Sequence, residues 1–220
     1  MIYQSAIKFL AKSDPVMRRL MKQIGPCGLE PQRARQPFES LVRAIAHQQI
    51  HGKAAEAILG RFVALYPGKF PQPAALLETD SAALRGCGFS QAKVAAILDI
   101  AAHTLAGTVP TLARIRKMPD EKIVQRLIQI RGVGRWTVEM LLIFQLGRPD
   151  ILPVDDFGIR NGFRIAYQCV AMPKPREVLE YGARWQPYRT VASWYLWRAA
   201  DMEKAKPVQA VRKARNKKKR

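Results

Sequence analysis

Two helical segments joined by a Gly-Val-Gly turn constrain this 220-residue chain more than any other feature. Apolar residues recur at helical spacing in the segment from Pro119 to Ile130, and the segment from Arg135 to Leu146 is apolar on nearly every face. The two glycines, Gly132 and Gly134, permit positive φ values and let a bulky anion approach the main chain. The sequence therefore predicts a tight helical hairpin whose second helix is central and buried.

The start of the second helix is suited to binding an anion. The first N–H groups of a helix have no partner within it, and the helix dipole places partial positive charge at the same end. In a basic protein the expected anion is a nucleic-acid phosphate. A plain tight connection is the alternative, because glycine pairs also join helices that bind nothing.

Charge favours the nucleic-acid interpretation. The chain holds 37 lysine and arginine residues against 17 acidic residues, a net charge of +20. The segment from Lys204 to Arg220 holds nine of the basic residues and no acidic one, and the remainder still has a net charge of +11. We expect residues 204–220 to form a disordered basic tail that attracts phosphates without reading sequence. The alternative is a solubilising tail or a chance likeness to a nuclear-localisation signal.

The composition argues against a membrane span and for a reducing compartment. No run of 18 apolar residues is present, and the N-terminal segment lacks the layout of a signal peptide. The three cysteines are far apart and odd in number, which argues against a disulfide framework. We expect them to be buried apolar residues, and no cluster of His, Cys and carboxylate residues has zinc-ligand spacing.

Helices are expected along most of the chain, from their caps and their apolar spacing, whereas strands are scarcely signalled. One begins at Ser13-Asp-Pro and one carries the apolar stripe 38–45; others are expected at 53–66, 80–84, 90–105, 119–130, 135–146, 156–170, 175–184 and 188–200.

Two adjacent aspartates, Asp155 and Asp156, precede the helix expected near Phe157. Aspartate is a preferred N-cap, so one of the two is expected to cap this helix. Adjacent residues point in different directions, which allows the other to face a cleft. A carboxylate beside bound DNA would stabilise the oxocarbenium character that develops on a sugar as its glycosidic bond breaks.

These motifs resemble the HhH-GPD superfamily of DNA glycosylases, and within it the alkyladenine branch, the 3-methyladenine DNA glycosylase II group. The resemblance rests on residues 130–137 and 153–160, with support from 38–50, 53–55, 84–90, 185–189 and 194–197. It implies an all-α fold of two helical lobes, with a helix-hairpin-helix motif and the active-site cleft between the lobes. Residues 1–35 and 150–203 would form one lobe, and residues 36–149, with the hairpin at 119–147, the other.

The resemblance implies a base-excision-repair enzyme. Such a glycosylase flips a damaged nucleotide out of double-stranded DNA and hydrolyses its N-glycosidic bond. The expected substrates are alkylated, cationic purines such as 3-methyladenine and 7-methylguanine. Asp156 matches the catalytic aspartate of the family, which leaves Asp155 as a structural residue. No metal is expected in catalysis, and the one cofactor that the resemblance admits is a monovalent cation at the hairpin.

Trp136 indicates which glycosylase mechanism to expect. In relatives that also cut the DNA backbone, a lysine at this position forms a Schiff base with the sugar. An indole cannot attack C1′, so we predict a monofunctional enzyme that activates water and leaves an abasic site.

The resemblance also assigns residues to three further parts of the site. The base pocket is expected to contain Trp136, Trp197, Gln48 and Met140, with the aromatic rings holding a cationic base by stacking and cation–π attraction. The wedge that fills the gap left by the flipped base is assigned to Ile50 and His51. Phosphate contacts are assigned to Gly132, Val133, Gly134, Arg135 and Thr137. For both tryptophans, a purely structural place in the core is the alternative.

Two other functions stay open at this point. The first is a glycosylase of the same fold that removes another lesion, such as hypoxanthine or an oxidised purine. The second is a non-catalytic helix-hairpin-helix DNA-binding module in which Asp156 is only a cap. The expected partner is double-stranded DNA, with no membrane, and a monomer is expected. The expected location is the cytoplasm and nucleoid in a bacterium, or the nucleus in a eukaryote.

Overall fold

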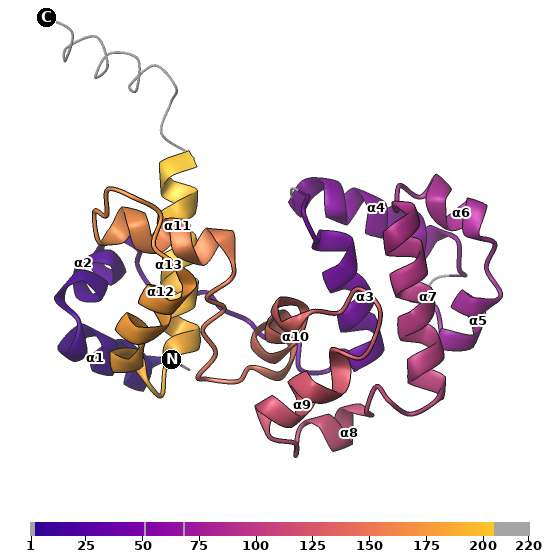
Figure 1. The fold of residues 1–220 in the computed structure, drawn as a ribbon, viewed down its shortest axis with the longest axis horizontal. Helices are drawn as coiled ribbons and strands as arrows, with labels where there is room; N and C mark the ends of the chain where they lie inside the picture. Colours follow the sequence, from indigo (N-terminus) through magenta and orange to yellow (C-terminus); the bar gives the residue numbers. More distant parts are fainter. Residues whose placement is uncertain (1–2, 51, 68, 205–220) are drawn as a thin grey trace, which may run out of the picture. The chain divides into compact units, whose positions relative to one another are not determined.

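The computed structural model describes residues 3–50, 52–67 and 69–204, and these residues form helices and connecting segments with no strand (Figure 1). They divide into two compact units. One comprises the described residues of Met1–Leu29 and Arg148–Arg220, and the other is Glu30–Gly147. The predicted all-α fold of two lobes is confirmed. His51, assigned to the wedge, and residues 205–220, assigned to the basic tail, lie outside the described residues.

The first unit is built from two distant stretches of the chain. Its helices are α1 (Gln4–Ser13), α2 (Pro15–Ile24), α11 (Phe157–Ala166), α12 (Pro175–Gly182), a short 3-10 helix (Ala183–Trp185) and α13 (Arg189–Lys204). Asp14 caps α2, because its Oδ1 accepts hydrogen bonds from the amides of Val16 and Met17. Pro15 stands at the first helical position, where no N–H donor is needed.

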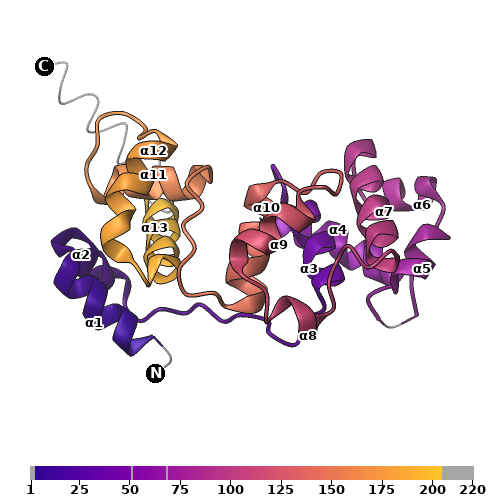
Figure 2. The same cartoon turned by 60° about the horizontal axis from the view of Figure 1, so that its bottom comes forward.

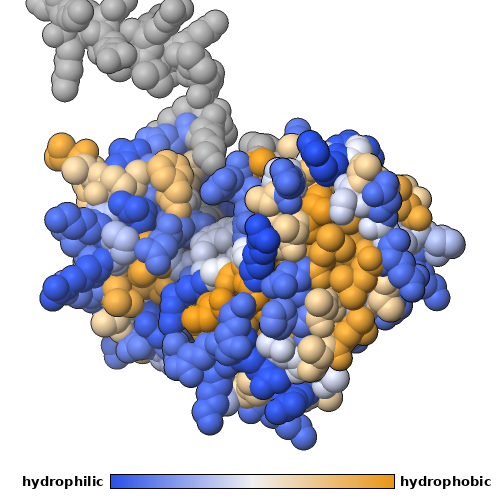
Figure 3. Space-filling model, turned by 45° about the vertical axis from the view of Figure 1, so that its right-hand side comes forward, coloured by the Kyte–Doolittle hydropathy of each residue, from blue (hydrophilic) through white to orange (hydrophobic). Residues whose placement is uncertain are grey.

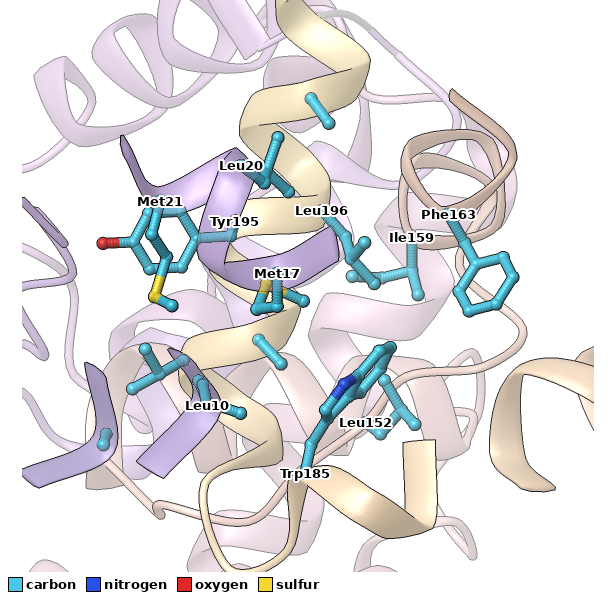
Figure 4. Packing of buried hydrophobic residues seen from close by; sticks show 14 of the residues in the cluster. Leu10, Met17, Leu20, Met21, Leu152, Ile159, Phe163, Trp185, Tyr195 and Leu196 are labelled. Atoms are coloured by element: carbon cyan, nitrogen blue, oxygen red, sulfur yellow. The ribbon is translucent and has the colours of Figure 1, made fainter. Parts of the chain in front are cut away.

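Helices α11 and α13 pack against each other in the core of this unit. Gly162 permits their close approach, since a Cβ atom at this position would clash with the carbonyl oxygen of Leu196. Figure 4 shows how side chains from both stretches of the chain meet, among them Leu10, Met17 and Ile159. Burial of each such side chain stabilises the fold by roughly 1.5–3 kcal/mol, so this core holds the two stretches together.

Asp14 is a buried polar centre within the same core. Its Oδ2 accepts hydrogen bonds from the Tyr167 hydroxyl at 2.6 Å and from the Trp185 Nε1 at 2.9 Å. With the two amides at Oδ1, the carboxylate accepts four hydrogen bonds. Burial raises the pKa of the Asp14 carboxyl, but the hydrogen bonds outweigh burial and hold this pKa below its ordinary value of 3.8.

The second unit is one continuous stretch. Its helices are α3 (Pro37–His47), α4 (Gly52–Ala64), α5 (Pro73–Leu77), α6 (Ser81–Gly86), α7 (Gln91–Leu105), α8 (Leu112–Ile115), α9 (Asp120–Leu127), α10 (Arg135–Leu141) and a π-helix (Leu142–Leu146). Helix α7 packs against α3 and α5 (Figure 2). It begins where the sequence predicts, after Ser90, whose hydroxyl accepts a hydrogen bond from the amide of Lys93.

Several helices differ from the sequence-based expectation. The helix predicted at 135–146 changes from α to π at Leu142, and Phe144 is exposed, so the prediction of a central, buried helix was wrong at that residue. The helix after Asp156 ends at Ala166 rather than Val170. Helix α1 was not predicted because it lacks a side-chain cap, and α5 and α8 are too short to show a period.

The surface is mixed in polarity. On the face shown in Figure 3, hydrophobic residues form patches among hydrophilic ones. No helix in the described ranges is both long and apolar enough to cross a membrane. The cysteines are free thiols, of which Cys87 is buried as predicted, whereas Cys27 and Cys169 are only half-buried.

Candidate functional site

The Gly-Val-Gly turn connects α9 and α10, and its two glycines differ in backbone conformation and in the space around them. Gly132 has a φ of +74°, and a Cβ atom there would lie 2.8 Å from the Cβ of Ala96. Gly134 has a φ of −90° as the N-cap of α10, and a Cβ atom there would meet nothing within 4 Å. Backbone conformation and packing therefore require Gly132, whereas Gly134 leaves open space at the start of a helix.

Main-chain donors are present at this turn. No side chain caps α10, and among the described residues no acceptor is found for the amides of Gly132 and Gly134. The amide of Val133 differs, since it donates to the carbonyl oxygen of Ile130 at 3.0 Å, and its side chain is buried. An approaching anion would thus find the two glycine amides, whereas the Val133 amide is used within the turn.

Gln48 contacts the hairpin from the end of α3. Its Nε2 donates to the carbonyl oxygen of Gly132 at 2.9 Å and to the hydroxyl of Thr137 at 3.0 Å. The Thr137 side chain is buried, so this hydroxyl is engaged inside the protein. Gln48 and Thr137, which the sequence analysis assigned to the base pocket and to phosphate contact, are therefore bonded to each other.

Ile50 is presented in the turn that follows α3. The helix ends at His47, and Gln49 adopts a φ of +58°, which is uncommon for a residue other than glycine. The Ile50 side chain is 38% exposed. An exposed aliphatic side chain beyond a left-handed residue has the chemistry that a DNA wedge needs.

Trp136 and Met140 lie one turn apart on α10, so they share a face of this helix, and both are half-buried. Arg135 is an exposed neighbour at the first position of the helix, where its Nη2 donates to the Glu121 carboxylate at 2.8 Å. An exposed ion pair of this kind contributes only about 0–1 kcal/mol to stability.

Asp156 is the N-cap of α11. Its Oδ1 accepts hydrogen bonds from the amide of Ile159 at 2.8 Å and from the Trp197 Nε1 at 2.8 Å. The residue is partly exposed, and the neighbouring Asp155 is exposed. Of the two aspartates, one of which was expected to cap this helix, Asp156 is the one that does so.

Gly158 lets the indole of Trp197 reach Asp156. A Cβ atom at Gly158 would lie 2.9 Å from Cδ1 of Trp197 and 3.0 Å from Oδ1 of Asp156. Trp197, which the resemblance assigns to the base pocket, also donates to Asp156, and the sequence did not predict this hydrogen bond because the two residues are 41 positions apart. The glycine two residues after Asp156 is the signal that could have indicated a close neighbour.

Comparison with known proteins identifies the family. The family model described as "HhH-GPD superfamily base excision DNA repair protein" matches residues 42–187, a range that contains both the hairpin and Asp156. This chain belongs to the HhH-GPD superfamily. The membership that the motifs predict is thereby confirmed.

Individual HhH-GPD proteins are similar over nearly the whole chain. DNA-3-methyladenine glycosylase 1 of Schizosaccharomyces pombe is 40% identical over 205 residues, which cover 91% of this chain and 89% of that protein. The alkylbase DNA glycosidase-like protein mag2 of the same organism is 36% identical over 204 residues, which cover 92% and 96%. A solved structure of the S. pombe 3-methyladenine DNA glycosylase in complex with abasic DNA is 41% identical with a TM-score of 0.84, covering 89% of this chain and 96% of that one. The predicted resemblance to the 3-methyladenine branch is confirmed.

Proposed function

We propose that this protein is a base-excision-repair DNA glycosylase that removes alkylated, cationic purines such as 3-methyladenine and 7-methylguanine from double-stranded DNA. One observation carries the proposal: a partly exposed Asp156 is held by the Trp197 indole in a chain 40% identical to a DNA-3-methyladenine glycosylase. The net charge of +20 supports DNA as the partner.

Asp156 would act on the sugar of the flipped nucleotide. As the N-glycosidic bond breaks, its electron pair leaves with the base, and a cationic purine departs as a neutral molecule. The carboxylate stabilises the positive charge that develops on the sugar, while the Ile159 amide and the Trp197 indole hold it in one orientation. Water then adds to C1′ and loses a proton, which leaves an abasic site.

The residue at position 136 supports a monofunctional reaction. Helix α10 reads Arg-Trp-Thr-Val-Glu-Met-Leu and contains no lysine that could attack C1′. We expect intact strands carrying abasic sites after base release. Strand breaks formed without added alkali, or an adduct trapped by borohydride, would contradict this part of the proposal.

The grip on DNA would come from the second unit. The amides of Gly132 and Gly134 would bind a phosphate at the start of α10, Arg135 would add positive charge, and Ile50 would be the wedge. The buried hydroxyl of Thr137 and the engaged amide of Val133 are better suited to holding the turn in shape. Trp136 and Met140 are offered as residues of the base pocket.

A monovalent cation at the hairpin is also part of the proposal. The main-chain carbonyl oxygens of the turn suit such an ion, and in the described part of the chain no group of three or more His, Cys, Asp and Glu residues is placed to hold a metal. The ion would lower the repulsion between a phosphate and these oxygens. Replacing K⁺ by tetramethylammonium at equal ionic strength should then weaken DNA binding.

The direct test is incubation of the purified protein with methylated duplex DNA, followed by chromatography of the released bases. We expect 3-methyladenine and 7-methylguanine to be released. Duplexes that each carry one hypoxanthine or one oxidised purine test the alternative lesions, and release of uncharged lesions alone would overturn the substrate assignment. DNA binding with no release of any base would favour the non-catalytic module instead.

A further inference from the structure

Lys93, on the first turn of α7, binds the end of another helix. Its Nζ donates to the carbonyl oxygen of Ala46 at 2.9 Å and to that of Gln48 at 2.8 Å. These oxygens belong to the last turn of α3 and to the segment that leads to Ile50. The last carbonyls of a helix have no partner within it, and a cation placed there satisfies them and matches the helix dipole. Burial lowers the pKa of the Lys93 ammonium, as its half-buried position requires.

The same face of α7 also holds the hairpin turn. The Cβ of Ala96 occupies the space that a side chain at Gly132 would need. The Oδ2 of Asp99 accepts a hydrogen bond from the amide of Arg131 at 2.7 Å. Lys93, Ala96 and Asp99 are three residues apart and therefore lie on one side of the helix. Helix α7 thus contacts both the turn that carries Ile50 and the turn that offers its amides to a phosphate.

Gln48 links these two turns directly. Its main-chain oxygen accepts from Lys93, while its side chain donates to Gly132 and Thr137. The next residue, Gln49, is left-handed, a conformation that persists only where the surrounding contacts determine it. The contacts of Lys93 are next to this residue in the chain, so they are well placed to maintain its conformation.

We propose that Lys93 is a positioning residue for base flipping, which fixes the Ile50 wedge relative to the hairpin turn that binds phosphate. Flipping requires the wedge to enter the duplex at the base step that the phosphate contact defines, so an error in their separation would misplace the wedge. The inference rests on the proposed function, because that proposal takes Ile50 as the wedge and the hairpin as the grip.

Single-turnover base release from methylated duplex DNA tests the inference with a double-mutant cycle. Lys93→Met keeps the apolar stem but loses the donors, and we expect release to slow about tenfold because the wedge is misplaced. Adding Lys93→Met to Ile50→Ala should cause no further loss, since Lys93 acts through Ile50. The inference would be overturned if the rate loss of the double variant equalled the product of the two single losses, or if Lys93→Met had a normal rate.

Two further variants separate positioning from other effects. Lys69→Met makes the same change at an exposed lysine of the same unit, and it should stay within about twofold of the wild-type rate. Lys93→Arg restores donors to the α3 carbonyls and should recover a large part of the rate. If Lys93→Arg is as slow as Lys93→Met while both are folded, the carbonyl contacts are not the cause.

A reporter that needs no chemistry distinguishes this inference from the proposed function. A duplex with a tetrahydrofuran abasic analogue beside 2-aminopurine should brighten when the wild-type protein inserts its wedge. Lys93→Met should bind this duplex with nearly the wild-type Kd but with a smaller fluorescence change, as Ile50→Ala should. If the wild type brightens the duplex but releases no base, the proposed function fails while positioning stands. An unchanged fluorescence response in Lys93→Met would refute positioning, whatever the base-release assay shows.

Discussion

Asp14 and Asp156 occupy the same kind of position in the same unit, yet their surroundings differ. Each is the N-cap of a helix, and each accepts a hydrogen bond from a tryptophan indole, Trp185 in one case and Trp197 in the other. Asp14 has no exposed surface, whereas Asp156 is partly exposed. A capping role therefore does not argue against a catalytic one, and exposure is what distinguishes the two carboxylates.

The largest effect is expected at the buried carboxylate. Asp14→Ala should lower the free energy of unfolding by about 4 kcal/mol, since it removes a cap and leaves the Tyr167 hydroxyl and the Trp185 N–H without their acceptor. Denaturant titration measures this loss. Asp80→Ala is a matched control, because Asp80 is an exposed cap with one described hydrogen bond, and it should cost about 1 kcal/mol. Equal losses at the two positions would mean that Asp14 contributes only a cap.

Substitution of the partly exposed carboxylate, Asp156, should change the activity rather than the stability. Asp156→Asn is expected to slow base release by about 100-fold or more, because the charge that stabilises the sugar is lost. The amide oxygen can still cap α11, so the midpoint of thermal unfolding should change little. Asp155→Asn, the control at the adjacent exposed residue, should retain activity. If Asp156→Asn changes only thermal stability, then the residue is a cap and the proposed mechanism is wrong.

The same comparison can be made for the two tryptophans that donate to these carboxylates, Trp185 to Asp14 and Trp197 to Asp156. Trp197→Phe keeps a ring but removes the donor to Asp156, and we expect base release to slow about tenfold through loss of orientation. Trp185→Phe removes the donor to Asp14 and should instead lower the free energy of unfolding by about 2 kcal/mol. Each variant is measured in both assays. A loss of stability alone from Trp197→Phe would remove the distinction between the two sites.

The smallest effect is a dependence on pH. Because the pKa of Asp14 is lower in the folded protein than its ordinary value of 3.8, its carboxylate stabilises the fold above that value. This stabilisation is lost as the pH falls through the lower, folded-state pKa and the carboxylate gains a proton. The free energy of unfolding should therefore fall more steeply in the wild type than in Asp14→Ala between about pH 5 and pH 2. Parallel curves would mean that the pKa of Asp14 is the same in both states.

Features set by neighbouring residues could be predicted from the sequence. The hairpin turn follows from Gly132 and Gly134, the start of α2 from Asp14 and Pro15, and the start of α7 from Ser90. Each depends on backbone conformations and caps within a few positions, so the pattern and its cause lie together in the chain. The pair Asp155 and Asp156 was recognised for the same reason.

Contacts between distant residues could not be predicted in this way. Gln48 and Thr137 are 89 positions apart, and Lys93 lies 47 positions from Ala46. A helical period shows which face of a helix is buried, but it does not show which polar side chain that face meets. The π-helix at Leu142–Leu146 likewise departs from the regular period on which the prediction of one continuous helix relied. The polar contacts of Trp197 with Asp156, and of Lys93 with Ala46 and Gln48, therefore became visible only in the folded structure.

The division of the first unit between two stretches of the chain bears on the order in which the protein acquires its parts during synthesis. The hairpin unit, Glu30–Gly147, is complete before α11 is made, so it can fold while the ribosome is still working. Helices α1 and α2, which carry Leu10 and Met17, can complete their core only after α13 has emerged. We expect a nascent chain to fold the unit that carries the hairpin turn first and the unit that carries Asp156 last, and pulse proteolysis of stalled chains would reveal that sequence of events.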